Sequence, residues 1–221
     1  MTASAAEDIV PLALRVSGVS KAFHRGPPWH RRRIDVLRDA SLEVKAGELV
    51  GLVGENGSGK STLMQIVVGL LPRDGGIVER AGRLGYCPQL SLLWEKLTIA
   101  EHFELFAEAY ELEDRVAQRS RDALLEELGF TRYVGYRVEE LSGGTRQKLN
   151  LALALFHEPS LLLLDEPYAG FDWETYLRFW EMAERRCGDG MGILIVSHLL
   201  AERDHLTRTY ELRDGRCEVI S

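Results

Sequence analysis

The chain has 221 residues, 45% of them hydrophobic and 28% charged, which is long and apolar enough for one sizeable globular domain. Its formal net charge of −7 and isoelectric point near 5.5 argue against a nucleic-acid-binding surface, and the single basic cluster, at residues 30–33, is short. No apolar run reaches the roughly eighteen residues needed to cross a bilayer, and the first residues are acidic where a signal peptide would be basic.

Apolar runs and helical patterns alternate along the chain. Residues 12–19 and 40–44 are expected to be strands of an opening antiparallel layer, with the polar insert 24–35 between them. A short apolar run at 48–53 enters a glycine loop. The later expected elements are a helix at 60–71, a strand at 83–88, a helical pattern at 99–129, a helix after residue 142, a strand at 161–166, a helix at 173–186, a strand at 192–198, and a hairpin at 209–220 that turns at Asp214-Gly215.

This order predicts an α/β fold. Continuous apolar strands separated by helices are typical of a parallel sheet that is buried on both faces. The long stretch after residue 90 carries no strand signal, so we expect an α-helical subdomain at approximately 90–155, inserted into a single domain that spans residues 1–221. The expected architecture is therefore a parallel sheet with an N-terminal antiparallel β layer and an inserted helical subdomain.

The strongest motif lies between the strand at 48–53 and the helix that follows it. It fits the pattern G-x-x-x-x-G-K-[ST] and consists of Gly54, Glu55, Asn56, Gly57, Ser58, Gly59, Lys60 and Ser61. Glycines let successive backbone N–H groups point at a phosphate, the lysine adds a positive charge, and the Ser61 hydroxyl completes a Mg²⁺ shell. A glycine-rich turn with a chance lysine is the alternative, and the strand–loop–helix context favours a nucleotide site in a P-loop NTPase core.

Acidic residues follow the leucine-rich strand at 161–166. Asp165 at its carboxyl end would hold Mg²⁺ through water, and Glu166 could polarise an attacking water. The alternative is a solvated acidic pair without a function. The phosphate loop elsewhere in the chain favours the functional interpretation over this alternative. His198 ends the strand at 192–198, where it could touch the γ-phosphate, although a lone histidine at a strand end is more often structural.

Ser142, Gly143 and Gly144 precede a long apolar helix, so they form a second candidate phosphate site. A helix start binds anions through unpaired amides and the positive end of the helix dipole. The alternative is a helix N-cap with a flexible turn, because serine is a good cap.

Together these motifs resemble the nucleotide-binding subunit of ATP-binding cassette (ABC) transporters, over nearly all of the chain. The stretch from Gly54 to Thr62 is similar to the family's Walker A motif. Residues 161–166 are similar to its Walker B motif, and residues 141–145 are similar to its signature motif. The other matches are Gln89 to the Q-loop glutamine, residues 169–172 to the D-loop, His198 to the switch histidine and Phe23 to the aromatic residue that stacks on adenine.

The resemblance implies a mechanism and a set of partners. ATP and Mg²⁺ are the expected cofactors, with Glu166 as catalytic base, His198 and Gln89 at the γ-phosphate, and Ser61, Gln89 and Asp165 at the metal. In the family two cassettes pair head to tail, so that the signature motif of one covers the ATP on the Walker A loop of the other. We therefore expect a homodimer that works with a separate integral membrane permease subunit and binds no nucleic acid.

Four positions depart from the commonest family pattern: Phe23, Thr145, Tyr168 and Phe171. None of them removes a phosphate ligand, the base or the switch histidine, so both sites of a homodimer are expected to be competent. Cys87, Cys187 and Cys217 are far apart and lack the spacing of a metal site. They are expected to be reduced thiols in a cytoplasmic protein that lies peripherally on the cytoplasmic face of the membrane.

The transported substrate is open. The pattern around Gln89 and the signature motif resemble the drug, natural-product and lipid export branch, so export of a small molecule, peptide or lipid ranks first. The stretch at 24–44, which includes the insert, is similar to cassettes of polysaccharide and teichoic-acid exporters, which rank second, ahead of import. A soluble cassette of the cluster-assembly type is a further alternative that the motifs leave open.

The segment after Gln89 carries four large apolar residues, Leu92, Leu93, Trp94 and Leu97. Such a group is either core or an interface. In the family this segment lines the cleft that receives a cytoplasmic helix of the membrane subunit. We expect Trp94 to be an interface anchor. For Leu92 and Leu97, a position in the core and a position in the interface are equally open.

Overall fold

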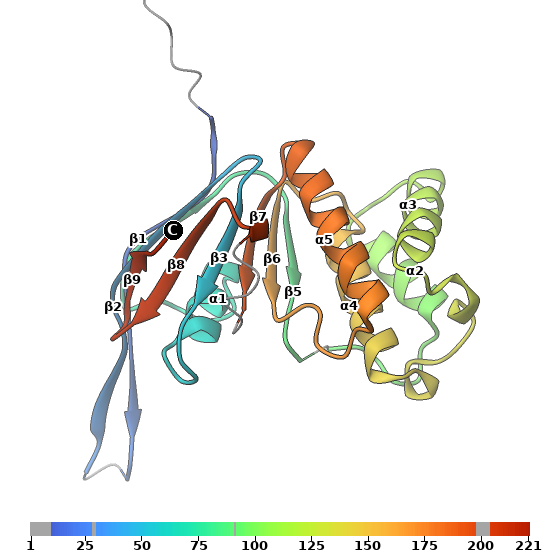
Figure 1. Cartoon of the computed structure of the whole chain (residues 1–221). Helices are drawn as coiled ribbons and strands as arrows, with labels where there is room; N and C mark the ends of the chain where they lie inside the picture. Colours follow the sequence, from blue (N-terminus) through green and yellow to red (C-terminus); the bar gives the residue numbers. More distant parts are fainter. Residues whose placement is uncertain (1–9, 28–29, 91, 198–203) are drawn as a thin grey trace, which may run out of the picture.

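A computed structural model describes residues 10–27, 30–90, 92–197 and 204–221. Its strands form two sheets, a three-stranded sheet in the order β2-β1-β4 and a six-stranded sheet in the order β5-β6-β7-β3-β8-β9. Figure 1 shows the sheets on one side of the molecule and most of the helices on the other. The predicted α/β class with an antiparallel N-terminal layer is confirmed.

The three-stranded sheet is antiparallel and contains β1 (Leu12–Arg25), β2 (Arg32–Lys45) and β4 (Gly75–Arg80). The polar insert at residues 24–35 is partly strand, because β1 extends to Arg25 and β2 begins at Arg32, and the two strands pair as a long hairpin arm. Strand β4 was not predicted. It lies at the edge of the sheet with most of its residues exposed, so it lacks the alternation of apolar and polar residues that indicates a strand.

The six-stranded sheet carries the elements that matter for the site. Its parallel strands are β3 (Leu49–Val53), β5 (Leu84–Cys87), β6 (Leu161–Asp165), β7 (Gly192–Val196) and β8 (Arg208–Arg213), and only β9 (Arg216–Val219) runs antiparallel. Strand β7 lies between β3 and β6. Because parallel strands end at the same edge, the loops after β3 and β6 lie close together.

The helices are α1 (Lys60–Val68), α2 (Ile99–Ala109), α3 (Asp114–Glu127), α4 (Gly143–Leu155) and α5 (Trp173–Gly188), with 3₁₀ turns at Thr131–Tyr133 and Val138–Glu140. Helix α1 ends earlier than expected because Gly69 adopts a left-handed conformation with φ 94°. The helical pattern at 99–129 splits into two helices at residues 110–113, where Glu111 has φ 53°. A capping box of Thr98 and Glu101 begins α2.

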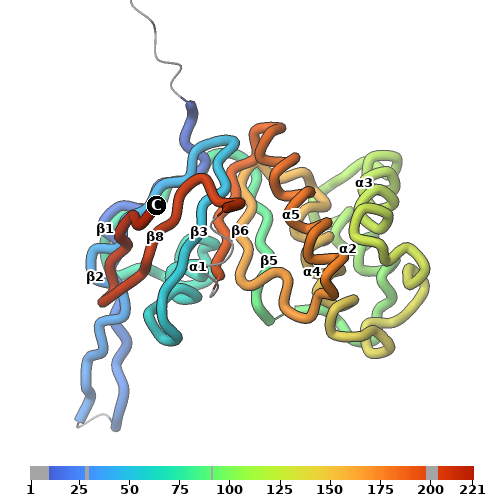
Figure 2. The backbone as a smooth tube through the Cα atoms, viewed as in Figure 1, coloured from blue at the N-terminus to red at the C-terminus, as the bar shows by residue number. Residues whose placement is uncertain are grey.

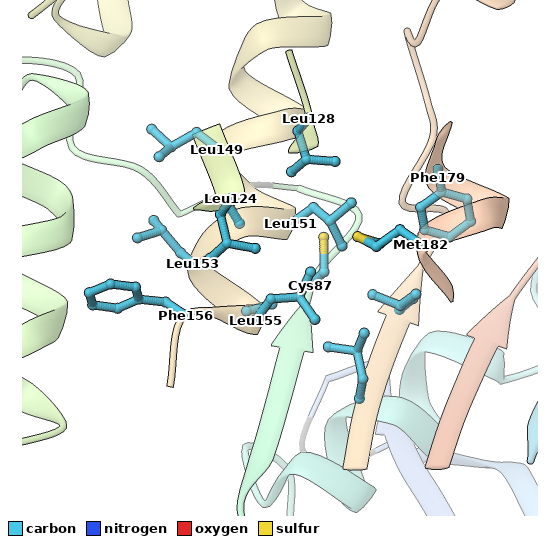
Figure 3. Packing of buried hydrophobic residues seen from close by; sticks show 14 of the residues in the cluster. Cys87, Leu124, Leu128, Leu149, Leu151, Leu153, Leu155, Phe156, Phe179 and Met182 are labelled. Atoms are coloured by element: carbon cyan, nitrogen blue, oxygen red, sulfur yellow. The ribbon is translucent and has the colours of Figure 1, made fainter. Parts of the chain in front are cut away.

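The central strands are buried on both faces, so the large sheet separates two hydrophobic clusters. Leu161 and Leu163 of β6 pack with α1 and the three-stranded sheet. Leu162 and Leu164 point to the other side and pack with residues of α2, α3, α4 and α5. Figure 3 shows part of this second cluster, with leucines of α4 around the thiol of Cys87. The helices after β5 therefore share their core with the sheet.

No described helix has the length and apolar character of a membrane span. The three cysteines are free thiols, two of them buried. Burial raises the pKa of Cys187 and of Cys217 to about 12, so neither forms a thiolate at neutral pH.

Candidate functional site

The loop between β3 and α1 depends on its glycines. Gly54 has φ 151°, and a Cβ there would lie 2.5 Å from the carbonyl oxygen of Leu212. Gly59, the N-cap of α1, has φ 109°, and its Cβ would lie 2.9 Å from Val36 Cγ1. Only glycine fits such positions, because a residue with a Cβ is strained at positive φ and here its Cβ would also clash with a neighbour. The loop therefore keeps its backbone close to the sheet and open to a ligand.

Lys60 is the first residue of α1 and is only 6% exposed. Its Nζ donates hydrogen bonds to the carbonyl oxygens of Gly54, at 2.6 Å, and of Glu55, at 3.0 Å, so the side chain lies across the loop. Burial lowers the pKa of Lys60, while Glu166 and Asp165 act in the opposite direction. A buried cation held above a bare backbone loop is suited to a phosphate.

A cavity of about 290 Å³ brings most of the predicted site residues together. Its lining comes from the loop, from α1, from β2 and from the ends of β5 and β6. It consists of Val36, Asn56, Gly57, Gly59, Lys60, Ser61, Thr62, Gln89, Asp165 and Glu166. Val36 of β2 was not predicted, and nothing in its local sequence sets it apart. A larger neighbouring cavity of about 640 Å³ shares Val36, Asn56 and Gly57 with the first, and also contains Glu55, Ser58 and the β8–β9 turn.

The acidic pair lies at the end of β6. Asp165 is 4% exposed, and Glu166 has φ 51°, a left-handed conformation that costs a residue other than glycine about 1–3 kcal/mol. The Glu166 backbone N–H donates to Val196 O at 3.1 Å, which ties this residue to the end of β7. Gln89 Nε2 donates to Glu166 Oε2 at 3.0 Å. The backbone strain is stored at the residue that the motif predicts to be the base.

The residues predicted to hold Mg²⁺ fit such an ion by their chemistry. The Ser61 hydroxyl, the Gln89 amide and the Asp165 carboxylate all line the 290 Å³ cavity. All three offer oxygen ligands, which Mg²⁺ prefers, and Mg²⁺ bound with a nucleotide typically uses one or two carboxylates together with the phosphates.

The structure places Ser142, Gly143 and Gly144 apart from this cavity, at the start of α4. The Ser142 Oγ accepts a hydrogen bond from the Thr145 backbone N–H at 3.2 Å, so the N-cap alternative is correct for its side chain. Gly143 has open space around its Cβ position, whereas a Cβ on Gly144 would lie 2.5 Å from Gly170 O of the predicted D-loop. The amide end of α4 is exposed beside the D-loop.

Two further predicted residues lie away from the cavity lining or outside the described residues. Phe23 is 41% exposed on β1, directly across from Ile34, which lines the larger cavity. The Lys21 ammonium lies 5.6 Å from the centre of the Phe23 ring. His198 lies outside the residues that the structure describes, so its predicted position next to the γ-phosphate stays a prediction.

Tyr168 connects two edges of the site in a way that the sequence did not suggest. Its hydroxyl donates a hydrogen bond to Ser197 Oγ at 2.8 Å. Tyr168 lies in the turn after β6, and Ser197 is the residue before His198. The tyrosine was visible as a departure from the family pattern, but its partner could not be known without the fold. This bond ties the segment that carries the predicted switch histidine to the segment that carries the base.

The apolar segment after Gln89 lies largely on the surface. Trp94 is 52% exposed and Leu92 is 80% exposed, while Leu93 packs against the core and Leu97 is half-buried. Buried His102 supports this segment: its Nε2 accepts from the Trp94 backbone N–H at 3.1 Å, and its ring lies 5.8 Å from the Trp94 ring. Trp94 therefore rests on a histidine that must be neutral to accept this bond.

We expect the free energy of unfolding to fall as the pH is lowered below about 6.5, in part because of His102. Burial lowers the pKa of His102 below its ordinary value of 6.5, against smaller opposing effects of the Thr98 carbonyl and Glu101. The unfolded chain therefore takes up this proton first, and stability is lost from the ordinary pKa down to the folded one. Denaturant titrations of the wild type and of His102→Gln should show a smaller pH dependence in the variant; equal dependence would contradict this role.

Comparison with known proteins agrees with these motifs. Residues 37–169, more than half of the chain, match the family model described as ABC transporter. The chain is 33% identical over 192 residues to the Nod factor export ATP-binding protein I of Cupriavidus pinatubonensis. The aligned region covers 81% of this chain and 59% of that protein. It is 34% identical to the lipopolysaccharide export system ATP-binding protein LptB of Acidithiobacillus ferridurans, with 85% and 83% coverage.

A solved structure of an ATP-binding subunit of an ABC transporter superposes with a TM-score of 0.83 at 30% identity, covering 93% of this chain and 88% of that one. The chain spans only part of several curated relatives, from 59% of the Nod factor export protein down to 8% of the glucosylceramide transporter ABCA12 of Mus musculus. The matched residues, the fold and the cavity lining agree on one assignment. The chain belongs to the ABC transporter family and is one of its ATP-binding cassette ATPases.

Proposed function

We propose that this chain is the ATP-hydrolysing subunit of an ABC exporter, and that two copies close head to tail around ATP and Mg²⁺. In this proposal residues 1–221 form one cassette domain with a helical subdomain at approximately 90–155. The cassette acts from the cytoplasmic face of the membrane on a separate permease subunit.

One observation carries the dimer proposal. The chain has a phosphate loop that lines a cavity with Gln89, Asp165 and Glu166, and a second anion-type helix start at Gly143 that is exposed elsewhere. The second feature has no role in the first cavity of its own chain. It fits the γ-phosphate bound to a second copy, which supports a shared site between two chains.

Glu166 is proposed as the general base, because it lines the cavity and carries its hydrogen bond from Gln89. Lys60 and the loop amides bind the phosphates, and Ser61, Gln89 and Asp165 would hold Mg²⁺, which would supply positive charge next to the phosphate oxygens. Phe23 is proposed to stack on adenine and His198 to contact the γ-phosphate. Loss of the γ-phosphate removes the contact that holds the two copies closed.

The segment after Gln89 is mechanically connected to the start of α4. Backbone hydrogen bonds join Glu139 N–H to Glu95 O at 3.1 Å and Val138 N–H to Leu97 O at 3.0 Å. An ion pair joins Lys96 Nζ to Glu139 Oε2 at 2.6 Å. A permease helix that contacts Trp94 would therefore be coupled to the signature helix as well as to Gln89.

We expect Trp94→Ala to weaken co-purification with the permease and to uncouple transport, while ATP binding by the isolated subunit stays the same. Trp94 is half exposed, and its backbone bond to His102 survives the substitution, so the isolated subunit loses only an aromatic contact of about 1 kcal/mol. The measurements are a pull-down with the permease and a thermal melt of the isolated subunit.

Leu70→Ala is the matched control, because Leu70 is a 67% exposed apolar residue outside this segment. It should leave the pull-down unchanged. A large fall in melting temperature for Trp94→Ala would place this side chain in the core, and an unchanged pull-down would remove it from the interface.

Export is supported by the names of relatives, which include a Nod factor export protein and a lipopolysaccharide export protein. Export of a small molecule, peptide or lipid remains our first proposal. Polysaccharide or lipopolysaccharide export is the second, because the chain covers 83% of the LptB relative.

Phosphate release by the purified chain with ATP and Mg²⁺ tests the ATPase part, with Lys60→Ala as the inactive control. A chain that releases phosphate no faster than this control would contradict the proposal. Transport of candidate substrates into vesicles that contain the permease then separates the two export classes.

A further inference from the structure

The hairpin arm of β1 and β2 carries a basic tip that the proposed ATPase mechanism does not use. Arg25, Arg31, Arg32 and Arg33 lie there with His24 and His30, and all six are exposed. Figure 2 shows β1 and β2 extending together as an arm away from the other labelled elements. We name these six residues the basic tip.

The register of the arm places two arginines directly opposite each other. Arg25 pairs across the strands with Arg32, and His24 pairs with Arg33. Like charges at directly opposite positions destabilise an antiparallel pair. Arg33 is compensated by Asp35, with 2.7 Å between Nε and Oδ1, whereas Arg25, Arg31 and Arg32 have no ion pair among the described residues. An external anion would relieve this repulsion.

The arm also holds the basic tip away from the acidic remainder of the chain. The four arginines contribute +4 to a total of −7, so the other residues carry −11. The last backbone hydrogen bond from the arm to the body joins Arg38 N–H to Gly215 O at 2.8 Å, and Ile34 is the last arm residue of β2 that lines the 640 Å³ cavity, so Arg32 and Arg33 lie beyond it.

We propose that the basic tip binds the anionic headgroups of a lipid bilayer, and so orients the cassette on the membrane. This inference rests on the proposed function, which places the chain at that surface. Arg25 and Arg32 point to one face of the hairpin, and their neighbours His24 and Arg33 to the other. Mobile headgroups can neutralise both faces of the arm, whereas a long nucleic acid would also meet the acidic body, which carries −11.

The test is flotation of the purified full chain with vesicles of phosphatidylcholine, with and without phosphatidylglycerol. The wild type should bind only the anionic vesicles and should be released by salt. Each basic residue near such a surface gives a roughly fivefold gain in partition, so Arg31→Gln/Arg32→Gln should bind about 25-fold more weakly.

The matched control is Arg115→Gln/Arg119→Gln, which removes the same charge from two exposed arginines of α3. It should bind like the wild type. Equal binding by the tip variant, equal loss in both variants, or tight binding of the wild type to duplex DNA would each overturn the proposal.

ATP hydrolysis separates this proposal from the function on which it rests. The tip variant should hydrolyse ATP in solution at the wild-type rate, because the substituted residues lie outside the candidate site. Full hydrolysis without tip-dependent vesicle binding rejects the membrane contact alone. Absence of hydrolysis in the wild type rejects the proposed function, whatever the vesicles show.

Discussion

Replacing Glu166 by glutamine should lower the rate of ATP hydrolysis by about 10²–10⁴-fold and leave ATP binding intact, because the change removes the general base and no phosphate ligand. Glutamine keeps the shape of the side chain and can still accept the hydrogen bond from Gln89 Nε2. The γ-phosphate then persists and should hold two copies together. Phosphate release measures the first effect, and light scattering with ATP and Mg²⁺ measures the second.

Glu158→Gln is a matched control. Glu158 also has a positive φ, of 52°, and is exposed away from the 290 Å³ cavity, so the same chemical change there should leave turnover unchanged. Wild-type turnover in Glu166→Gln would remove this residue as the base. If Glu166→Gln loses turnover but stays monomeric with ATP, the result would support Glu166 as the base and contradict the shared site.

Lys60→Ala and Gly143→Arg should separate ATP binding from hydrolysis. The Lys60 variant loses a charge-assisted contact to phosphate, so its affinity for ATP should fall about 10- to 100-fold. The Gly143 variant should bind ATP as the wild type does and lose hydrolysis, because the arginine would fill the position of the partner's γ-phosphate. Fluorescent nucleotide binding and phosphate release measure the two properties.

Gly143 is a sharper position for this change than Ser142. A Ser142 substitution removes the α4 cap, which costs about 1 kcal/mol, whereas Gly143 has open space around its Cβ position. Gly135→Arg is the control, since Gly135 also has nothing within 4 Å of its Cβ position. If Gly143→Arg lowers ATP affinity as strongly as Lys60→Ala, the two motifs belong to one nucleotide in one chain.

The sequence predicted the parts of the site whose geometry is local. The glycine spacing from Gly54 to Lys60 determines a loop and a helix start by itself, and the loop has the expected form. Apolar runs such as residues 161–164 are continuous because both faces are buried, so the parallel strands were recognisable. The Asp214-Gly215 turn also lies where the dipeptide indicates, with positive φ at both residues.

The parts that escaped prediction depend on contacts distant in sequence. Strand β4 forms only because β1 offers a free edge, and the arm continues through residues that look like a polar loop. Val36 reaches the cavity through the register of β2, and Tyr168 meets Ser197 through strand order in the large sheet. Local composition contains none of this information.

In the proposed dimer each ATP lies between the Walker A loop of one copy and the signature helix of the other. Mixing purified Lys60→Ala with Gly143→Arg tests this arrangement, with phosphate release as the measurement. A mixed dimer combines the intact loop of the second variant with the intact signature of the first, so the mixture should recover hydrolysis that neither variant has alone. If the mixture stays as inactive as its components while both are folded, the two motifs do not form a site between chains.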